Sequence, residues 1–178
     1  MRILFFCLSL ILGSAFVAAQ PKWRVYTPAN KIFTVELPWN PHYKRLEAHA
    51  LMMGTAGPFK GINSIETYDF SMYINEEHTS FELRVYDLAK TRSEADFDKE
   101  VGEIIANSFK PSASVSNKSV VVNGLHGKEY LFVNGKESAR ILFVVSGHRA
   151  YLMRFSTEDK KGVDRGPVNR VFDSFQPK

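Results

Sequence analysis

Apolar residues gather in short strand-length stretches between residues 115 and 156, and three two-residue turns separate these stretches. The turns are Asn123-Gly124, Asn134-Gly135 and Gly147-His148. Asn-Gly favours a type I′ hairpin, in which both central residues have positive φ, and Gly-X favours a type II′ hairpin. The pattern therefore predicts four consecutive antiparallel strands, a meander, over residues 115–156.

The turn positions also predict which residues lie opposite one another in neighbouring strands. The expected pairs are Tyr130 with Ala139, Ile141 with Arg154, Phe143 with Leu152, and Val145 with Ala150. Glu129 and Arg140 are expected to face each other in the same way. Such a pair would form a cross-strand ion pair, which contributes a fraction of a kcal/mol, roughly 0.2–1.

Both faces of the predicted meander are apolar, because side chains alternate across a strand and both alternating sets are hydrophobic. One face carries Tyr130, Phe132, Ala139, Ile141, Phe143, Val145 and Leu152. The other face carries Leu131, Val133, Leu142, Val144, Tyr151, Met153 and Phe155. A sheet with one solvent-facing side would alternate apolar and polar residues, so this sheet must be covered on both sides.

Two amphipathic segments can supply that cover. The first opens with Thr91-Arg92-Ser93-Glu94, which matches a capping box, and Pro111 ends it. Its apolar stripe is Phe97, Val101, Ile104, Ile105 and Phe109. The second opens with Gly166-Pro167 and carries Val168, Val171, Phe172 and Phe175 at helical spacing. The expected fold is α+β, an α/β/α sandwich whose central antiparallel sheet has helix 91–109 on one face and helix 166–175 on the other.

The first half of the chain adds further strand patterns. Residues 23–26 and 31–37 form two short strand-like runs that are expected to pair across the turn at residues 27–30. Residues 62–73 and 81–88 form two more, joined by a polar loop over 75–79. Part of the segment near residues 44–52 also has a strand pattern.

Residues 1–19 have the pattern of a signal peptide, with Arg2, an apolar run, and small residues at Val17 and Ala19. Cleavage is expected before Gln20, which leaves residues 20–178 as one domain exported to a periplasm or the extracellular space. The alternative is an uncleaved membrane anchor, for which the run is short. Cys7 is the only cysteine and lies within the apolar run. A cysteine-free exported domain fits a bacterial envelope and excludes thiol chemistry.

The distribution of charged residues does not indicate a nucleic-acid partner. Without Arg2 the chain has 22 basic and 19 acidic residues, a net charge of +3, since the full chain has 23 and 19. The basic residues are scattered among acidic ones, whereas a nucleic-acid-binding domain gathers them on one face.

The sequence also lacks the motifs of common enzyme classes: the helical His-Glu-x-x-His, Gly-x-Ser-x-Gly, the P-loop and the dinucleotide glycine fingerprint. His126 and Glu129 are three residues apart on a strand and therefore lie on opposite faces, so they cannot share a metal. The acidic residues of the first helix are interpreted as a solvated face; they are Asp96, Asp98, Glu100 and Glu103. We expect no catalytic residue, no metal site and no cofactor.

Several short motifs resemble small exported PsbP-like domains. They are Trp23-Arg-Val-Tyr-Thr-Pro28, Phe33-Thr-Val-Glu-Leu-Pro38, Asn123-Gly-Leu-His-Gly-Lys-Glu129, Gly147-His-Arg-Ala-Tyr151 and Val171-Phe-Asp-Ser-Phe175. The resemblance implies the α/β/α sandwich of the Mog1/PsbP-like superfamily and a non-catalytic binding or assembly factor. It implies no particular partner, because no photosystem-binding or Ran-binding motif is present.

The segment 39–61 holds large apolar residues among glycines and prolines. Trp39, Met52, Met53 and Phe59 are the candidate partner-binding residues, because methionine adapts to many surfaces and aromatic residues often anchor interfaces. The alternative is that these side chains fold back on the core.

Three hypotheses of function follow. The first is an exported non-catalytic binding or assembly module with a protein partner in the bacterial envelope. The second is a carrier of a small apolar ligand or lipid, held between the sheet and the C-terminal helix. The third is a metal-assisted hydrolase that uses the histidines of irregular segments, His42, His49 and His78.

Overall fold

The computed structural model describes residues 22–47, 59–74, 77–108, 114–135, 137–158, 162–164 and 166–178. The predicted signal peptide and its cleavage site lie outside the described residues. So do His49, Met52, Met53, Phe109 and Pro111.

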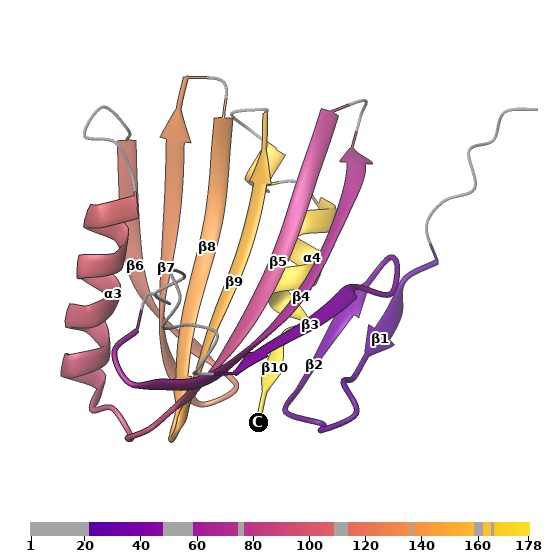
Figure 1. The fold of residues 1–178 in the computed structure, drawn as a ribbon. Coiled ribbons are helices and arrows are strands. Elements are labelled where there is room, and N and C mark those ends of the chain that lie inside the picture. The colour runs from indigo at the N-terminus through magenta and orange to yellow at the C-terminus, as the bar shows by residue number, and fades with distance from the viewer. Residues whose placement is uncertain are drawn as a thin grey trace, which may run out of the picture.

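A seven-stranded antiparallel sheet forms the body of the described chain (Figure 1), and its strands lie in the order β3-β4-β5-β9-β8-β7-β6. The strands are β3 (His42–Glu47), β4 (Ile62–Ile74), β5 (Glu77–Leu88), β6 (Ser114–Val122), β7 (Leu125–Asn134), β8 (Glu137–Ser146) and β9 (Arg149–Thr157). The predicted meander is therefore one half of the sheet. The hairpin β4–β5 extends it, and its pairing continues to Ile74 and Glu77, so the predicted loop over 75–79 is shorter than expected.

A second, three-stranded sheet joins the two ends of the described chain. It has the order β1-β2-β10, with β1 (Arg24–Tyr26), β2 (Phe33–Leu37) and β10 (Gln176–Pro177). The predicted pairing of the first two strands is confirmed, with Tyr26 opposite Val35. The Tyr151 hydroxyl lies 3.0 Å from the carbonyl oxygen of Ile32 and 2.8 Å from that of Lys178, which fastens the small sheet to β9.

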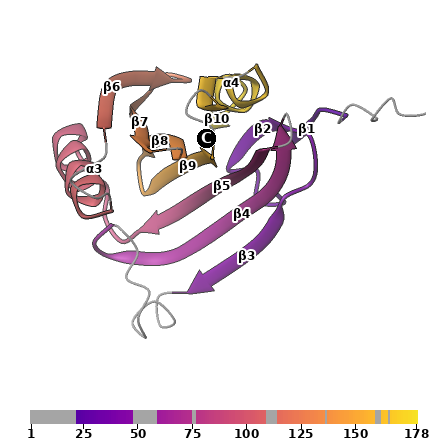
Figure 2. The same cartoon turned by 90° about the horizontal axis from the view of Figure 1, so that it is seen from above.

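Two helices and a short 3₁₀ turn complete the described structure: α3 (Glu94–Ser108), α4 (Gly166–Asp173) and η1 (Gly162–Asp164). Phe97 and Val101 of α3 pack in one hydrophobic core with Phe143 of the sheet. Val168 of α4 packs in a second core that also contains Phe33 of the small sheet. Figure 2 shows α3 on one side of the large sheet and α4 with the small sheet on the other. The fold is α+β, and the small sheet shares the layer of α4, which the sequence pattern did not indicate.

The two faces of the meander divide between these cores as predicted, but one register was wrong. Asn134 pairs with Glu137, so the loop begins at Gly135, whose φ is 63°, and Tyr130 lies opposite Ile141 rather than Ala139. A shift of two residues leaves every side chain on its predicted face, because the side-chain period of a strand is two. The predicted pairs across β8 and β9 are confirmed.

Glu129 and Arg140 illustrate the consequence of that shift. Glu129 of β7 lies opposite Leu142 of β8, whereas Arg140 lies two residues before Leu142 on β8, opposite Leu131. The expected directly opposed pair is therefore wrong. The two side chains still meet diagonally, with 2.8 Å between Arg140 Nη2 and Glu129 Oε2.

The N-terminus of α3 differs from the predicted capping box. Ser93 Oγ accepts the backbone N–H of Asp96 at 3.1 Å and donates to the Asp96 carboxylate at 2.7 Å. Phe97 N–H donates to the carbonyl of Ser93 at 3.0 Å, so Ser93 is the N-cap and Thr91 is not. Thr91 and Ser93 are both good capping residues with an acid three positions later, so the sequence offered two registers for the same start.

Candidate functional site

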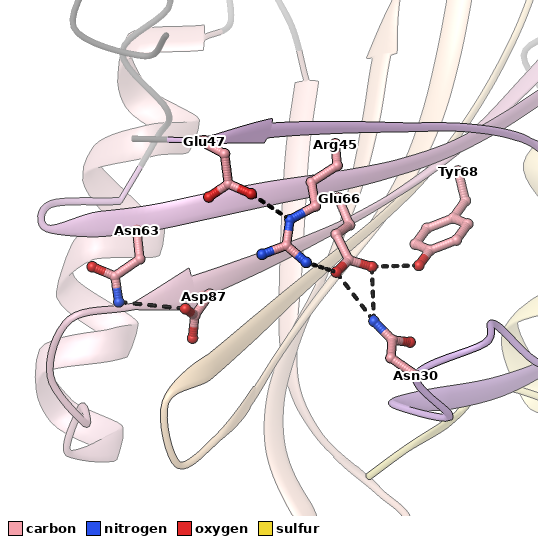
Figure 3. A network of polar contacts seen from close by, with 7 residues as sticks. All are labelled: Asn30, Arg45, Glu47, Asn63, Glu66, Tyr68 and Asp87. Atoms are coloured by element: carbon pink, nitrogen blue, oxygen red, sulfur yellow. Dashed lines mark hydrogen bonds and ion pairs between the residues drawn. The ribbon is translucent and has the colours of Figure 1, made fainter. Parts of the chain in front are cut away.

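The carboxylate of Glu66 on β4 is almost completely buried, at 7% exposure, and three polar side chains surround it. Tyr68 donates its hydroxyl proton to Oε2 at 2.6 Å. Asn30 donates from Nδ2 to both oxygens, at 3.1 and 3.0 Å, and Arg45 Nη1 lies 3.4 Å from Oε1 (Figure 3). Burial of a charge requires such partners, because an unpaired carboxylate in the interior costs several kcal/mol, on the order of 2–7 for a polar group and more for an ion.

Three segments that are distant in the sequence meet at this carboxylate. Strand β3 pairs with β4 so that Arg45 lies opposite Glu66, which puts both side chains on one face of the sheet. Asn30 comes from the turn between β1 and β2, where the Lys31 N–H donates to the Pro28 carbonyl at 2.9 Å and Lys31 has a φ of 55°. Figure 3 shows Asn30 reaching from the small sheet toward the large one. Glu66 therefore connects the two sheets.

Aromatic rings line the space beside Glu66. The ring centroids of Tyr43 and Tyr68 are 5.1 Å apart, and those of Tyr26 and Tyr68 are 6.0 Å apart in an edge-to-face arrangement. Phe33 lies behind them, 5.0 Å from Tyr68. Tyr26, Tyr43 and Tyr68 border a depression of about 340 Å³, named here the tyrosine pocket, whose other lining residues are Pro28, Ala29, Asn30, Arg45 and Glu66.

The surroundings of the tyrosine pocket favour the neutral form of two of its phenols, Tyr26 and Tyr68. Burial, together with the hydrogen bond to Glu66, raises the pKa of Tyr68 far above its usual range. Burial and the neighbouring Tyr43 and Glu66 also raise the pKa of Tyr26. The charged residues that line the pocket are Glu66 and Arg45, and Arg45 Nε also lies 2.6 Å from the carboxylate of Glu47, which is outside the lining. These three groups carry a net charge of −1.

The Glu66 carboxylate is unsuited to act as a general base in this arrangement. Each of its oxygens accepts two hydrogen bonds from described residues, which occupies the roughly four lone-pair positions of a carboxylate. A general base needs a lone pair directed at the proton it removes. The geometry suits a carboxylate that fixes neighbouring side chains and carries a charge rather than one that transfers a proton.

The four residues expected to bind a partner have different positions. Trp39 is 43% exposed and contacts Phe70 by its edge, with ring centroids 6.4 Å apart. Phe59 is only 4% exposed and stacks on Phe97 at 6.0 Å, so it belongs to the core and the expectation of an accessible contact residue was wrong for it. Met52 and Met53 lie outside the described residues.

The sequence pattern did not indicate Glu66, Tyr43 or Asn30 as site residues. Glu66 sits in an otherwise strand-like run, and its burial depends on contacts with segments 21 and 36 residues away. Tyr43 lies at the start of β3 and is 55% exposed. The available signal was an acidic residue that shares the strand face of apolar neighbours such as Phe70, which indicates a buried charge with a partner elsewhere.

A second polar cluster ties α3 to the sheet. His126 Nε2 lies 2.7 Å from Asp98 Oδ1, and Lys128 Nζ lies 3.0 Å from Asp98 Oδ2. The interpretation of Asp98 as part of a solvated helix face was therefore wrong. Burial opposes its ionisation, but the hydrogen bonds to His126 and Lys128 outweigh burial and lower the pKa of Asp98. This cluster has a structural role, because it fixes α3 against β7.

The histidines do not assemble a metal centre among the described residues. His42 and His78 lie in strands β3 and β5 rather than in irregular segments. Across the described part of the chain, no three side chains of the His, Cys, Asp and Glu types converge on a point where an ion could bind. Within the same residues, neither helix has the length and apolar composition needed to cross a membrane.

Comparison with known proteins identifies a fold but no close relative. No protein-family model matches the chain, and no curated protein is detectably similar in sequence. The solution structure of cyanobacterial PsbP (CyanoP) from Synechocystis sp. PCC 6803 matches with a TM-score of 0.50 and 13% identity, over 94% of this chain and 99% of that one. A Pseudomonas aeruginosa protein of unknown function, PA94, described as a putative regulator, matches 88% of this chain and 97% of its own at 11% identity and a TM-score of 0.45. The chain has a PsbP-like fold.

Proposed function

We propose that this chain is an exported, non-catalytic binding or assembly module whose partner is a protein of the bacterial cell envelope. The observation that carries the proposal is the exposed aromatic edge formed by Trp39 and Tyr43, which are 43% and 55% exposed. Tryptophan and tyrosine are the residues most enriched at energetically important points of protein interfaces. Trp39 lies three residues before the first residue of β3, and Tyr43 lies within the strand.

The backbone of β3 strengthens this proposal. Strand β3 is the end strand of the seven-stranded sheet, and among the described residues only β4 pairs with it. Its side chains are exposed at five of six positions. A free sheet edge offers unpaired N–H and C=O groups, to which a partner can add an extended segment. Aromatic contacts and backbone pairing are thus available side by side.

One fold serves many functions, so the proposal rests on the exposed surface of this chain and its fold sets where that surface can be. We infer an α/β/α arrangement in which α3 is one layer, the large sheet the second, and α4 with the small sheet the third. In this arrangement the hydrophobic faces of the sheet are occupied internally, so a partner must use loops or edges. We keep Met52 and Met53 with Trp39 as proposed partner-binding residues and exclude Phe59, because its ring is buried.

We also propose that residues 1–19 are removed on export and that residues 20–178 form one domain. The support is the short apolar run that ends at the small residues Val17 and Ala19. An intact-mass measurement of the exported protein tests this. A mass that includes residues 1–19 would contradict it.

The carrier hypothesis receives less support. A depression of about 460 Å³ lies between the end of the meander and α4, where such a ligand was expected. Lys118, Glu129 and Arg140 form a charged network along it, with distances of 3.0 and 2.8 Å. An apolar ligand there would remove water from these charges without replacing their interactions, which is unfavourable.

A capture experiment with matched variants tests the binding proposal. Wild-type protein, Trp39→Ser/Tyr43→Ser and Val121→Ser are immobilised and exposed to an envelope extract, and the retained proteins are identified by mass spectrometry. Val121 is the control, because it is 76% exposed on β6 at the opposite edge of the sheet. We expect one retained protein to be lost from the double variant only, with circular dichroism showing that the variant is folded. Equal capture by all three proteins would refute the proposed surface.

A further inference from the structure

We propose that the tyrosine pocket binds a quaternary ammonium group. The inference shares Tyr43 with the proposed partner-binding surface, but it stands on the pocket itself and does not require the protein partner. It combines three observations: a net negative charge on the group Glu66, Arg45 and Glu47, of which Glu66 and Arg45 line the pocket, a wall of aromatic rings, and a carboxylate whose hydrogen-bonding positions are already occupied.

The sign of the charge selects a cation. Glu66 is 7% exposed, so its charge acts through a medium of lower dielectric than water. Arg45 only partly offsets the charge of Glu66, because its guanidinium is half exposed and also pairs with Glu47. Its Nε lies 2.6 Å from Glu47, whereas its Nη1 lies 3.4 Å from Glu66. A ligand in the pocket therefore experiences a net negative site.

The aromatic wall selects a cation that is large and weakly hydrated. Tyr26, Tyr43 and Tyr68 all border the pocket, and the raised pKa values of Tyr26 and Tyr68 keep their rings uncharged. The faces of such rings attract cations, and this is the usual means of recognising quaternary ammonium groups. The volume of about 340 Å³ lies at the small end of the range of ligand sites, which suits a compact head group.

The hydrogen bonds of Glu66 distinguish a quaternary ammonium from a primary one. A primary ammonium has three N–H donors and must replace the water it loses with acceptors. Glu66 already accepts from Tyr68, Asn30 and Arg45 at all its positions. A quaternary ammonium has no N–H donor, so it gains the charge and the aromatic contacts without leaving a donor unpaired.

Titration of the wild-type protein with choline, followed by NMR, tests the proposal directly. We expect saturable shifts of the Asn30 side-chain amide and of the ring signals of Tyr26, Tyr43 and Tyr68. The neutral isostere 3,3-dimethylbutan-1-ol has the same shape without the charge and should bind about tenfold more weakly, the ratio that corresponds to a moderate cation–π contribution. Methylammonium should also bind more weakly than choline.

Variants place the site. Tyr43→Leu should weaken choline binding about tenfold, and because Tyr43 is 55% exposed the variant is expected to fold. Trp39→Leu is the matched control, since Trp39 is an exposed aromatic residue that does not line the pocket. Trp39→Leu should leave choline binding unchanged even if it abolishes partner capture, which separates this inference from the proposed function.

The same group could arrive as a free solute or on a protein side chain. A peptide that contains trimethyl-lysine is therefore titrated in parallel with choline. The probe that binds more tightly identifies the source, and tight binding of either probe supports the site. The absence of saturable shifts with both probes, or equal binding of choline and its neutral isostere, would overturn the proposal.

Discussion

Replacement of Phe59 by alanine measures how firmly the end of the 39–61 segment belongs to the core. Phe59 is 4% exposed and stacks on Phe97, with ring centroids 6.0 Å apart and an interplanar angle of 7°. Its edge contacts with Tyr86 at 5.1 Å and Phe143 at 6.4 Å complete an aromatic cluster between α3 and the sheet. The truncation therefore opens a cavity that helix, sheet and loop all border.

The expected cost follows from the buried area. A buried aromatic side chain removes roughly 150–250 Å² from water, which at about 25 cal/mol per Å² corresponds to about 4–6 kcal/mol as an upper bound. Alanine retains part of that burial, so a loss of about 3–5 kcal/mol is expected, in line with other Phe→Ala substitutions in cores. Since domains of this kind are stable by only about 5–15 kcal/mol, Phe59→Ala should remove about a fifth or more of the stability.

Urea unfolding followed by circular dichroism provides the measurement. The midpoint should fall strongly while the slope of the transition stays constant, which identifies a change in stability rather than in the unfolded state. Val121→Ala, at a residue 76% exposed, is the control and should change the free energy of unfolding by no more than about 0.5 kcal/mol. A loss for Phe59→Ala below about 1 kcal/mol would refute the core assignment and return Phe59 to the candidate binding surface.

Two further predictions concern capping and charge. Ser93→Ala should lower the free energy of unfolding by about 1 kcal/mol, because the N-cap bond to Asp96 is lost. Thr91→Ala should lower it by no more than about 0.5 kcal/mol. If urea midpoints showed the opposite order, Thr91 would be the N-cap residue. Burial opposes ionisation of Glu129, but hydrogen bonds from Arg140 and Lys118 outweigh it and lower the pKa of Glu129 below its usual value of 4.5. The stabilisation is therefore present above pH 4.5 and is lost as the pH falls through the lowered pKa of Glu129. Glu129→Gln should therefore reduce the drop in urea midpoint that acid causes in the wild-type protein. An unchanged pH profile would show that the network contributes nothing to stability.

The strands could be predicted from the sequence because their signals are local. Asn123-Gly124 and Gly147-His148 mark hairpins through the positive φ that their geometry requires, and both turns lie where expected. The predicted faces of the sheet were correct despite the wrong register at Gly135, because a shift of two residues leaves each side chain on the same face. Strand β10, with only two residues, is too short to leave a periodic pattern.

The candidate site could not be predicted in the same way, because it exists only through tertiary contacts. Its residues Asn30, Arg45 and Glu66 come from three separate segments, and no motif in the sequence around any of them indicates a shared site. Phe59 and Trp39 looked equivalent as large apolar residues in an irregular segment. Whether such a ring turns inward depends on a neighbouring surface, here the face of Phe97, and not on any period in its own segment.

The pairing of β10 with β2 has a consequence for the order in which the chain can fold. Thr34 and Gln176 contact each other across 142 residues, and Phe33 and Phe175 belong to the same core. Closing a flexible loop of that length costs on the order of 4 kcal/mol of chain entropy, which must be spent before the contact stabilises anything. Contacts of such long separation slow folding, because this entropy must be lost before they stabilise the chain. When the chain is delivered N-terminus first, one hydrophobic core of the sheet stays open until residues 166–178 arrive.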